Sequence, residues 1–157
     1  MSIRIGINGF GRVGRLGLRA GWDNDSFEVA HVNELKGGCR LAAHLLEYDT
    51  VHGRWDRGIE AGDDWFSIEG RKVSFSEEAV PGAVNWDAHG VDLVVESSGK
   101  FRTRELLQPY FGGSVRKVVV AAPVQGALNI VMGCNDELYD PVQHDLVTAA
   151  SCTTNCI

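Results

Sequence analysis

Gly9-Phe10-Gly11-Arg12-Val13-Gly14 is the stretch that decides the fold, because it places a G-x-G-x-x-G motif between two regular elements. The run from Arg4 to Asn8 before it reads as a short strand, and Val13 to Ala20 reads as a helix. The first glycine permits a tight turn, the second lets the backbone approach a pyrophosphate, and the third lets the helix pack on the strand. Free N–H groups at the helix N-terminus would face the phosphates. The motif therefore predicts a dinucleotide site.

An acidic residue completes this fingerprint. Dinucleotide-binding motifs are followed, about 20 positions further on, by an acid at the end of the second strand that binds the adenosine ribose. Glu34 stands there, after the apolar run from Phe27 to Val32. Its carboxylate would accept from the 2′-OH and repel a 2′-phosphate, which predicts NAD over NADP, although Lys36 is close enough to weaken that preference. The alternative interpretation is a glycine turn beside a solvated glutamate.

Strand-like and helix-like segments alternate along the rest of the chain. We expect helices at Leu41 to Tyr48 and at Thr103 to Phe111, with Thr103 as an N-cap. Between Arg54 and Ser76, short segments separated by turns predict a small antiparallel insertion. Further apolar strands are expected at residues 91–96, 117–121, 129–132 and 146–148. Parallel neighbours need crossover connections, so the pattern predicts an α/β fold: a Rossmann-type, mainly parallel sheet with a small antiparallel β insertion, with residues 1–157 as one NAD-binding domain.

Composition narrows the class of partner. The 157 residues carry a formal net charge of −6, with 44% hydrophobic and 23% charged residues, which is typical of a globular domain. Because phosphate contacts need a basic face, this balance argues against a nucleic-acid partner. No apolar run approaches the roughly 20 residues of a membrane span, and no signal-peptide pattern is present. We therefore expect a cytoplasmic protein without a membrane partner.

The four cysteines show neither a disulfide framework nor paired C-x-x-C zinc spacing. Cys39 and Cys134 are expected to be small buried residues. Cys152 and Cys156 would share one face of a helix, which leaves a metal pair open, but no histidine follows His144 and no metal site is predicted. In Ser151-Cys152-Thr153-Thr154-Asn155-Cys156 the hydroxyl-flanked Cys152 looks like a nucleophile, with Cys156 as a packing residue.

Three segments together resemble phosphorylating glyceraldehyde-3-phosphate dehydrogenase, in its N-terminal NAD-binding half. They are Ile7 to Arg15, Leu46 to Gly53 and Ala150 to Cys156, and the resemblance spans essentially the whole chain. It implies a glycolytic oxidoreductase that converts an aldehyde phosphate, glyceraldehyde 3-phosphate, and inorganic phosphate through a cysteine thioester. It also implies a full-length homotetramer whose second, catalytic domain carries the histidine and lies outside this sequence.

The same resemblance implies roles for individual residues. Cys152 corresponds to the catalytic thiolate, and Ser151 and Thr153 to residues beside the acyl and phosphate sites. The cofactor-binding residues implied by motif and resemblance are Gly9, Phe10, Gly11, Arg12, Val13, Gly14, Glu34, Ser98 and Gly99. A nucleophilic cysteine needs a helix N-terminus or a histidine nearby, and little sequence follows Cys152, so we expect these 157 residues alone to be inactive.

Departures from the family pattern keep alternatives open. Ala121, Lys100 and the tripeptide Asn33-Glu34-Leu35 differ from the residues usual in the family. They are compatible with two alternatives: a paralogue acting on erythrose 4-phosphate, or one using arsenate as acceptor. Two further alternatives are a stand-alone NAD-binding module without catalysis and an assembly domain that keeps the fingerprint by descent alone.

Overall fold

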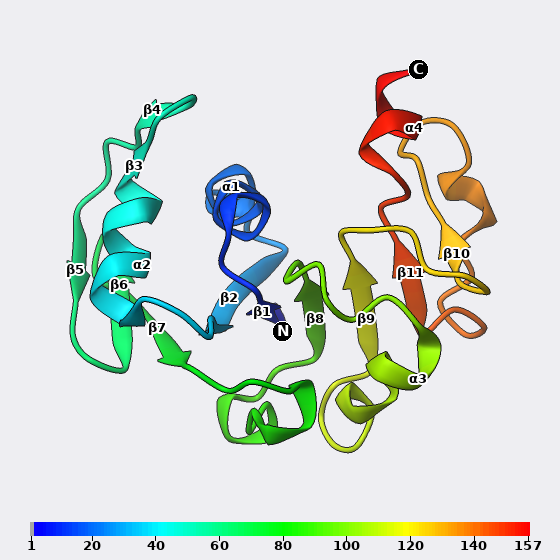
Figure 1. Cartoon of the computed structure of the whole chain (residues 1–157), viewed down its shortest axis with the longest axis horizontal. Coiled ribbons are helices and arrows are strands. Elements are labelled where there is room, and N and C mark those ends of the chain that lie inside the picture. The colour runs from blue at the N-terminus through cyan, green and yellow to red at the C-terminus, as the bar shows by residue number, and fades with distance from the viewer. Residues whose placement is uncertain (1) are drawn as a thin grey trace.

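A nine-stranded sheet runs through the computed structural model, which describes residues 2–157 (Figure 1). Its strand order is β10-β11-β9-β8-β1-β2-β7-β6-β5. The strands from β10 to β7 are mutually parallel, and β6 and β5 add antiparallel pairs at one edge. The parallel strands are β1 (Ile3–Asn8), β2 (Phe27–Asn33), β7 (Arg71–Ser76), β8 (Leu93–Glu96), β9 (Lys117–Val120), β10 (Leu128–Asn129) and β11 (Leu146–Thr148). The predicted fold class, including the antiparallel insertion, is confirmed.

The remaining elements connect these strands. The antiparallel edge is β5 (Ile59–Ala61) and β6 (Trp65–Ile68), and a separate hairpin pairs β3 (Tyr48–Asp49) with β4 (Gly53–Arg54). The α-helices are α1 (Arg12–Gly21), α2 (Gly38–Glu47), α3 (Arg104–Leu107) and α4 (Cys152–Cys156). Short 3-10 helices cover Pro81–Ala83, Asp87–His89, Gln108–Tyr110 and Asp136–Leu138. Figure 1 shows α2 and β5 at one end of the sheet, with β10 and α4 at the other.

Two hydrophobic cores lie on opposite faces of the sheet. Alternate side chains of a strand point to opposite faces, so Val29 joins one core and its neighbour Ala30 the other. Residues of α1 and α2, such as Leu18 and Leu46, build the first core. Leu107 of α3 builds the second. This two-faced covering explains why the parallel strands are apolar runs rather than strictly alternating ones.

Local polar groups account for the differences from the predicted elements. The strand expected at residues 129–132 lies instead at Leu128–Asn129. It ends there because the Asn135 side chain accepts from Val131 N–H and donates to the Asn129 carbonyl. Thr103 does cap α3, yet the α-helix ends at Leu107 and continues as a 3-10 turn that contains Pro109, which lacks an N–H donor. Cys39 is buried as expected, whereas Cys134 and Cys156 are exposed, which corrects their prediction as packing residues.

His31 is a buried residue of β2, the strand that pairs with β7. Its Nδ1 and Nε2 atoms each lie 2.8 Å from a serine hydroxyl, of Ser74 and Ser76, and its ring stacks on His89 with the centroids 4.0 Å apart. Burial, together with the neighbouring His89, lowers the pKa of His31 to about 3. The folded chain therefore holds His31 neutral over a range in which a solvated histidine takes up a proton.

We expect the free energy of unfolding to fall as the pH drops from about 6.5 towards 3. In this window the unfolded chain binds a proton at His31 that the folded chain refuses, so acid favours unfolding by about 1.4 kcal/mol per pH unit for this group. Urea titrations at several pH values, with His31→Gln beside the wild type, measure the difference in slope. Burial also lowers the pKa of His89, so a residual slope from that group is expected in both proteins. Parallel stability curves for the two proteins would contradict the assignment.

Within residues 2–157, no helix combines the length and apolarity needed to cross a membrane.

Candidate functional site

The strand order places a crevice beside the carboxyl end of β1. This strand pairs with β2 on one side and with β8 on the other. The order of the strands along the chain therefore reverses direction at β1. In open α/β sheets, ligands bind at such a switch point, where the loops after neighbouring strands separate. The glycine motif follows β1 at this point, and the Ser98-Gly99 loop follows β8.

Two of the three motif glycines are required by packing. Gly9 has a φ of +88°, and a Cβ built on it would lie 2.3 Å from the Ser98 backbone nitrogen. A Cβ on Gly14 would lie 2.3 Å from the Gly9 carbonyl oxygen. The turn therefore packs against both the Ser98 loop and the first turn of α1, closer than any side chain would allow.

The middle glycine faces open space instead. A Cβ on Gly11 would meet no atom within 4 Å, and Gly11 is the N-cap of α1. Neither a side-chain cap nor an acidic residue serves the first turn of this ten-residue helix, so its leading N–H groups point outward without a side-chain acceptor. A bare helix N-terminus of this length, opening on space beside a glycine, suits an anionic group such as a pyrophosphate.

Glu34 lies directly after β2, at the same edge of the sheet. Its Oε2 atom accepts from Phe10 N–H across 2.7 Å, and Oε1 accepts from the backbone N–H of Lys36 across 3.3 Å. The carboxylate is thus tied to the glycine turn, and since each oxygen has two lone pairs, acceptor capacity remains for a ribose hydroxyl. The contact with Lys36 runs through backbone, not through its ammonium group.

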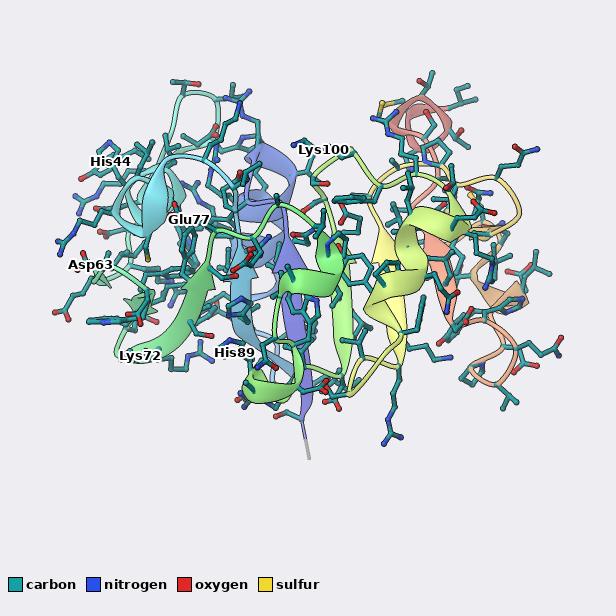
Figure 2. All side chains as sticks on the ribbon, turned by 60° about the horizontal axis from the view of Figure 1, so that its bottom comes forward. His44, Asp63, Lys72, Glu77, His89 and Lys100 are labelled. Atoms are coloured by element: carbon teal, nitrogen blue, oxygen red, sulfur yellow. The ribbon has the colours of Figure 1, made fainter. Side chains whose placement is uncertain are left out.

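A cleft of about 130 Å³ joins these groups. Gly9, Gly11, Glu34 and Ser98 of the predicted set line it together. Sequence reasoning missed the other lining residues: Asn8, Asn33, Leu35, Glu78, Ala79, Ser97, Lys100 and Phe101. The placement of Asn8 and Asn33 as the last residues of β1 and β2 was a usable signal, because ligands bind at strand ends. Figure 2 shows Lys100 on the loop after β8, at the end of the molecule opposite to His89.

Five other predicted residues are not part of the cleft lining: Phe10, Arg12, Val13, Gly14 and Gly99. The Phe10 side chain is only 2% exposed and stacks on Phe66 in the core, so only its backbone faces Glu34. Val13 is 58% exposed on the first turn of α1. The Arg12 guanidinium reaches away to the β3–β4 hairpin, where Nε donates to Asp49 Oδ2 across 3.1 Å.

Asp49 holds that hairpin in place. Its Oδ1 accepts from the backbone N–H groups of Val51 and His52, each across 2.9 Å. The bonds from His52 and Val51 keep the pKa of Asp49 below its usual value. The carboxylate thus stays available to Arg12, which couples the start of α1 to the hairpin that follows α2.

Cys152 opens α4 after β11, at the same edge of the sheet as the glycine motif. β11 lies three positions from β1 in the strand order, a separation of about 14 Å at the usual strand spacing. Cys152 is a free, exposed thiol, and Ser151 caps α4 by accepting from Thr153 N–H across 3.3 Å. Ala150, two residues before Cys152, has a φ of +57°, a left-handed conformation that costs alanine about 1–2 kcal/mol. Backbone strain of this kind is often found at functional turns.

Residues 2–157 contain no group of three or more His, Cys, Asp or Glu side chains that could hold a metal ion.

Comparison with known proteins identifies relatives for the whole chain. Residues 3–104 match the family model for the glyceraldehyde 3-phosphate dehydrogenase NAD binding domain. The chain is 59% identical over 158 residues to glyceraldehyde-3-phosphate dehydrogenase 3 of Nostoc sp., covering 100% of this chain and 47% of that protein. It is 42% identical to glyceraldehyde-3-phosphate dehydrogenase 1 of Bacillus cereus, covering 98% of this chain and 46% of the relative. The chain thus spans about half the length of the curated relatives it matches.

Proposed function

Because this chain belongs to the glyceraldehyde-3-phosphate dehydrogenase family and carries its NAD-binding domain, we propose that residues 1–157 bind NAD in the cleft beside β1 and present the nucleophile of an aldehyde dehydrogenase. One observation supports this proposal above all. Three separate loops contribute residues to a single cleft: Gly9, Gly11, Glu34 and Ser98. In this proposal Glu34 binds the adenosine ribose and Ser98-Gly99 flank the adenine.

The pyrophosphate would lie at the start of α1. Backbone N–H groups of Arg12 and Val13 are proposed to donate to it, with Gly11 leaving room for its approach. The positions of Phe10 and Gly14 support this arrangement, because the Phe10 N–H holds Glu34 and Gly14 lets α1 approach the turn. When bound, NAD supplies the acceptor for a hydride.

Cys152 is proposed to attack the carbonyl carbon of glyceraldehyde 3-phosphate. Its sulfur would form the covalent bond to that carbon, the aldehyde hydrogen would leave as the hydride that NAD accepts, and the acyl group left on sulfur would pass to inorganic phosphate. Ser151 and Thr153, next to it at the start of α4, would border the acyl and phosphate positions. The histidine that activates the thiol is proposed to come from the part of the enzyme outside these 157 residues, since the relatives are about twice as long. We further propose a cytoplasmic homotetramer that binds neither nucleic acid nor membranes, in keeping with the net charge of −6.

Calorimetric titration of the chain with NAD and NADP tests the cofactor assignment. We expect tighter binding of NAD, because the 2′-phosphate of NADP would face the Glu34 carboxylate. Glu34→Ala should weaken NAD binding about tenfold through the loss of a charged acceptor, and should narrow the discrimination against NADP.

A matched control is Glu60→Ala, which removes the same charge from an exposed position on β5, away from the cleft. It should leave both affinities unchanged. Equal affinities of the wild type for NAD and NADP, or a Glu34→Ala variant that binds NAD as tightly as the wild type, would move the ribose contact to another residue.

A further inference from the structure

A buried carboxylate lies directly beneath the cofactor cleft. Glu96, the last residue of β8, is 2% exposed. In the described part of the chain no lysine, arginine or histidine forms an ion pair with it. Burying a charged group without such a partner is costly unless hydrogen bonds replace its lost water. The number and direction of those bonds therefore indicate what the side chain is kept for.

Four donors converge on Glu96, two on each oxygen. Oε1 accepts from the backbone N–H of Ser98 across 2.7 Å and from its hydroxyl across 2.5 Å. Oε2 accepts from Asn8 Nδ2 across 2.7 Å and from the phenol of Tyr110. Burial and the adjacent Glu96 raise the pKa of Tyr110, which keeps the phenol a donor. One oxygen of Glu96 thus holds the loop after β8, while the other is anchored in the core.

The anchored side extends to the other walls of the cleft. Asn8 accepts from Asn33 Nδ2 across 2.7 Å, and Asn33 in turn bonds to both the N–H and the carbonyl of Glu78. Asn8, Asn33 and Glu78 all line the cleft, as does Ser98. Glu96 therefore stands at the end of a hydrogen-bonded chain that joins the ends of β1, β2 and β8.

The Ser98 loop packs closely against the glycine turn. The Ser98 backbone nitrogen lies only 2.3 Å from the place of a Gly9 Cβ, so any movement of the loop towards or away from the turn alters their contact. We propose that Glu96 is a positioning residue: it holds the Ser98-Gly99 wall of the cleft at the spacing that the adenosine end of the dinucleotide needs, without touching the cofactor. This inference rests on the proposed NAD site.

The test compares two variants that cut the network on opposite sides of the carboxylate. Glu96→Met keeps the length of the side chain but removes both oxygens, so Ser98 loses its two acceptor contacts. Tyr110→Phe removes one donor from the core side and leaves both Ser98 bonds in place. For each variant, urea unfolding, titration with NAD and with ADP-ribose, and hydrogen exchange of the Ser98 amide are measured.

We expect both variants to be destabilised, but only Glu96→Met to lose affinity. Its dissociation constants for NAD and ADP-ribose should rise at least about tenfold, and the Ser98 amide should exchange faster. Tyr110→Phe should bind both ligands within about threefold of the wild type, with the Ser98 amide still protected. Equal losses of affinity in the two variants would reduce Glu96 to a stability residue and overturn the inference, as would unchanged binding by Glu96→Met.

Glu96→Gln decides the question if Glu96→Met does not fold. The carboxamide keeps the shape, yet has one acceptor oxygen for two pairs of donors. Weaker NAD binding by a folded Glu96→Gln supports the inference, and binding within about twofold of the wild type overturns it. If the wild-type chain binds NAD while Glu96 variants bind equally well, only the inference fails. If the wild type binds no NAD, the proposed function fails and the inference with it.

Discussion

Gly9→Ala should destabilise the folded chain by about 2–5 kcal/mol, a large share of the stability of a domain of this size. Alanine at a φ of +88° carries about 1–2 kcal/mol of backbone strain. Its Cβ would also lie 2.3 Å from Ser98 N, 2.4 Å from Ser98 Cα and 2.7 Å from the Ser97 carbonyl carbon, and overpacking of this kind costs about 1–3 kcal/mol. These neighbours are backbone atoms, so no side chain can turn aside to make room.

The Ser97–Ser98 segment is itself fixed, which prevents relaxation. Ser97 N–H donates to the Asn8 carbonyl across 2.8 Å, and its hydroxyl donates to the Gly9 carbonyl across 2.6 Å. Urea unfolding measures the loss. Gly17→Ala is the matched control, because Gly17 is an exposed residue inside α1 whose Cβ would meet no atom within 4 Å, so that alanine should stabilise the helix by up to about 1 kcal/mol. A Gly9→Ala protein as stable as the wild type would mean that the turn is not held against Ser98.

Local sequence signals predicted the sheet well because each carries its own physical cause. The glycine motif sets a turn and a helix start, and apolar runs such as residues 91–96 indicate strands buried on both faces. The β3–β4 hairpin was not predicted. Its strands are two residues each, too short for any periodicity, and it is held by the Asp49 side chain rather than by a pattern. The helix expected to end at Tyr48 ends one residue earlier, at Glu47, because Tyr48 is the first residue of this hairpin.

Some features of the candidate site could likewise be predicted from the sequence, and others could not. Gly9, Gly11 and Glu34 were predicted from spacing alone, since a single crossover unit brings them together. The contact between Gly9 and Ser98 was not predictable, because 89 positions separate them and only the order of β1 and β8 in the sheet makes them neighbours. The positioning role of Glu96 was not predicted, because a charged residue at the end of an apolar strand is usually exposed to solvent. The roles of Ser151, Cys152 and Thr153 stay predictions.

Gly11→Ala should leave the fold intact and weaken NAD binding about a hundredfold. The backbone of Gly11, with φ −66° and ψ −167°, is allowed for alanine, and its Cβ would meet no protein atom within 4 Å. In the bound state the methyl group would occupy the space through which a pyrophosphate approaches the start of α1. A clash costs about 1–3 kcal/mol, and the weakened bonds to the helix N–H groups add to it. Calorimetric titration with NAD, beside urea unfolding of the same protein, measures both quantities.

This outcome is the opposite of the one expected for Gly9→Ala. Both substitutions add one methyl group to the same turn, two residues apart, yet one Cβ points into the Ser98 backbone and the other into open space. A loss of stability in Gly11→Ala would mean that the glycine serves packing, as Gly9 does. If a stable Gly11→Ala protein bound NAD with full affinity, the pyrophosphate could not lie at the start of α1. The cofactor would then bind at another part of this sheet edge. Loss of affinity without loss of stability places the dinucleotide against this helix, because only an added ligand can meet that methyl group.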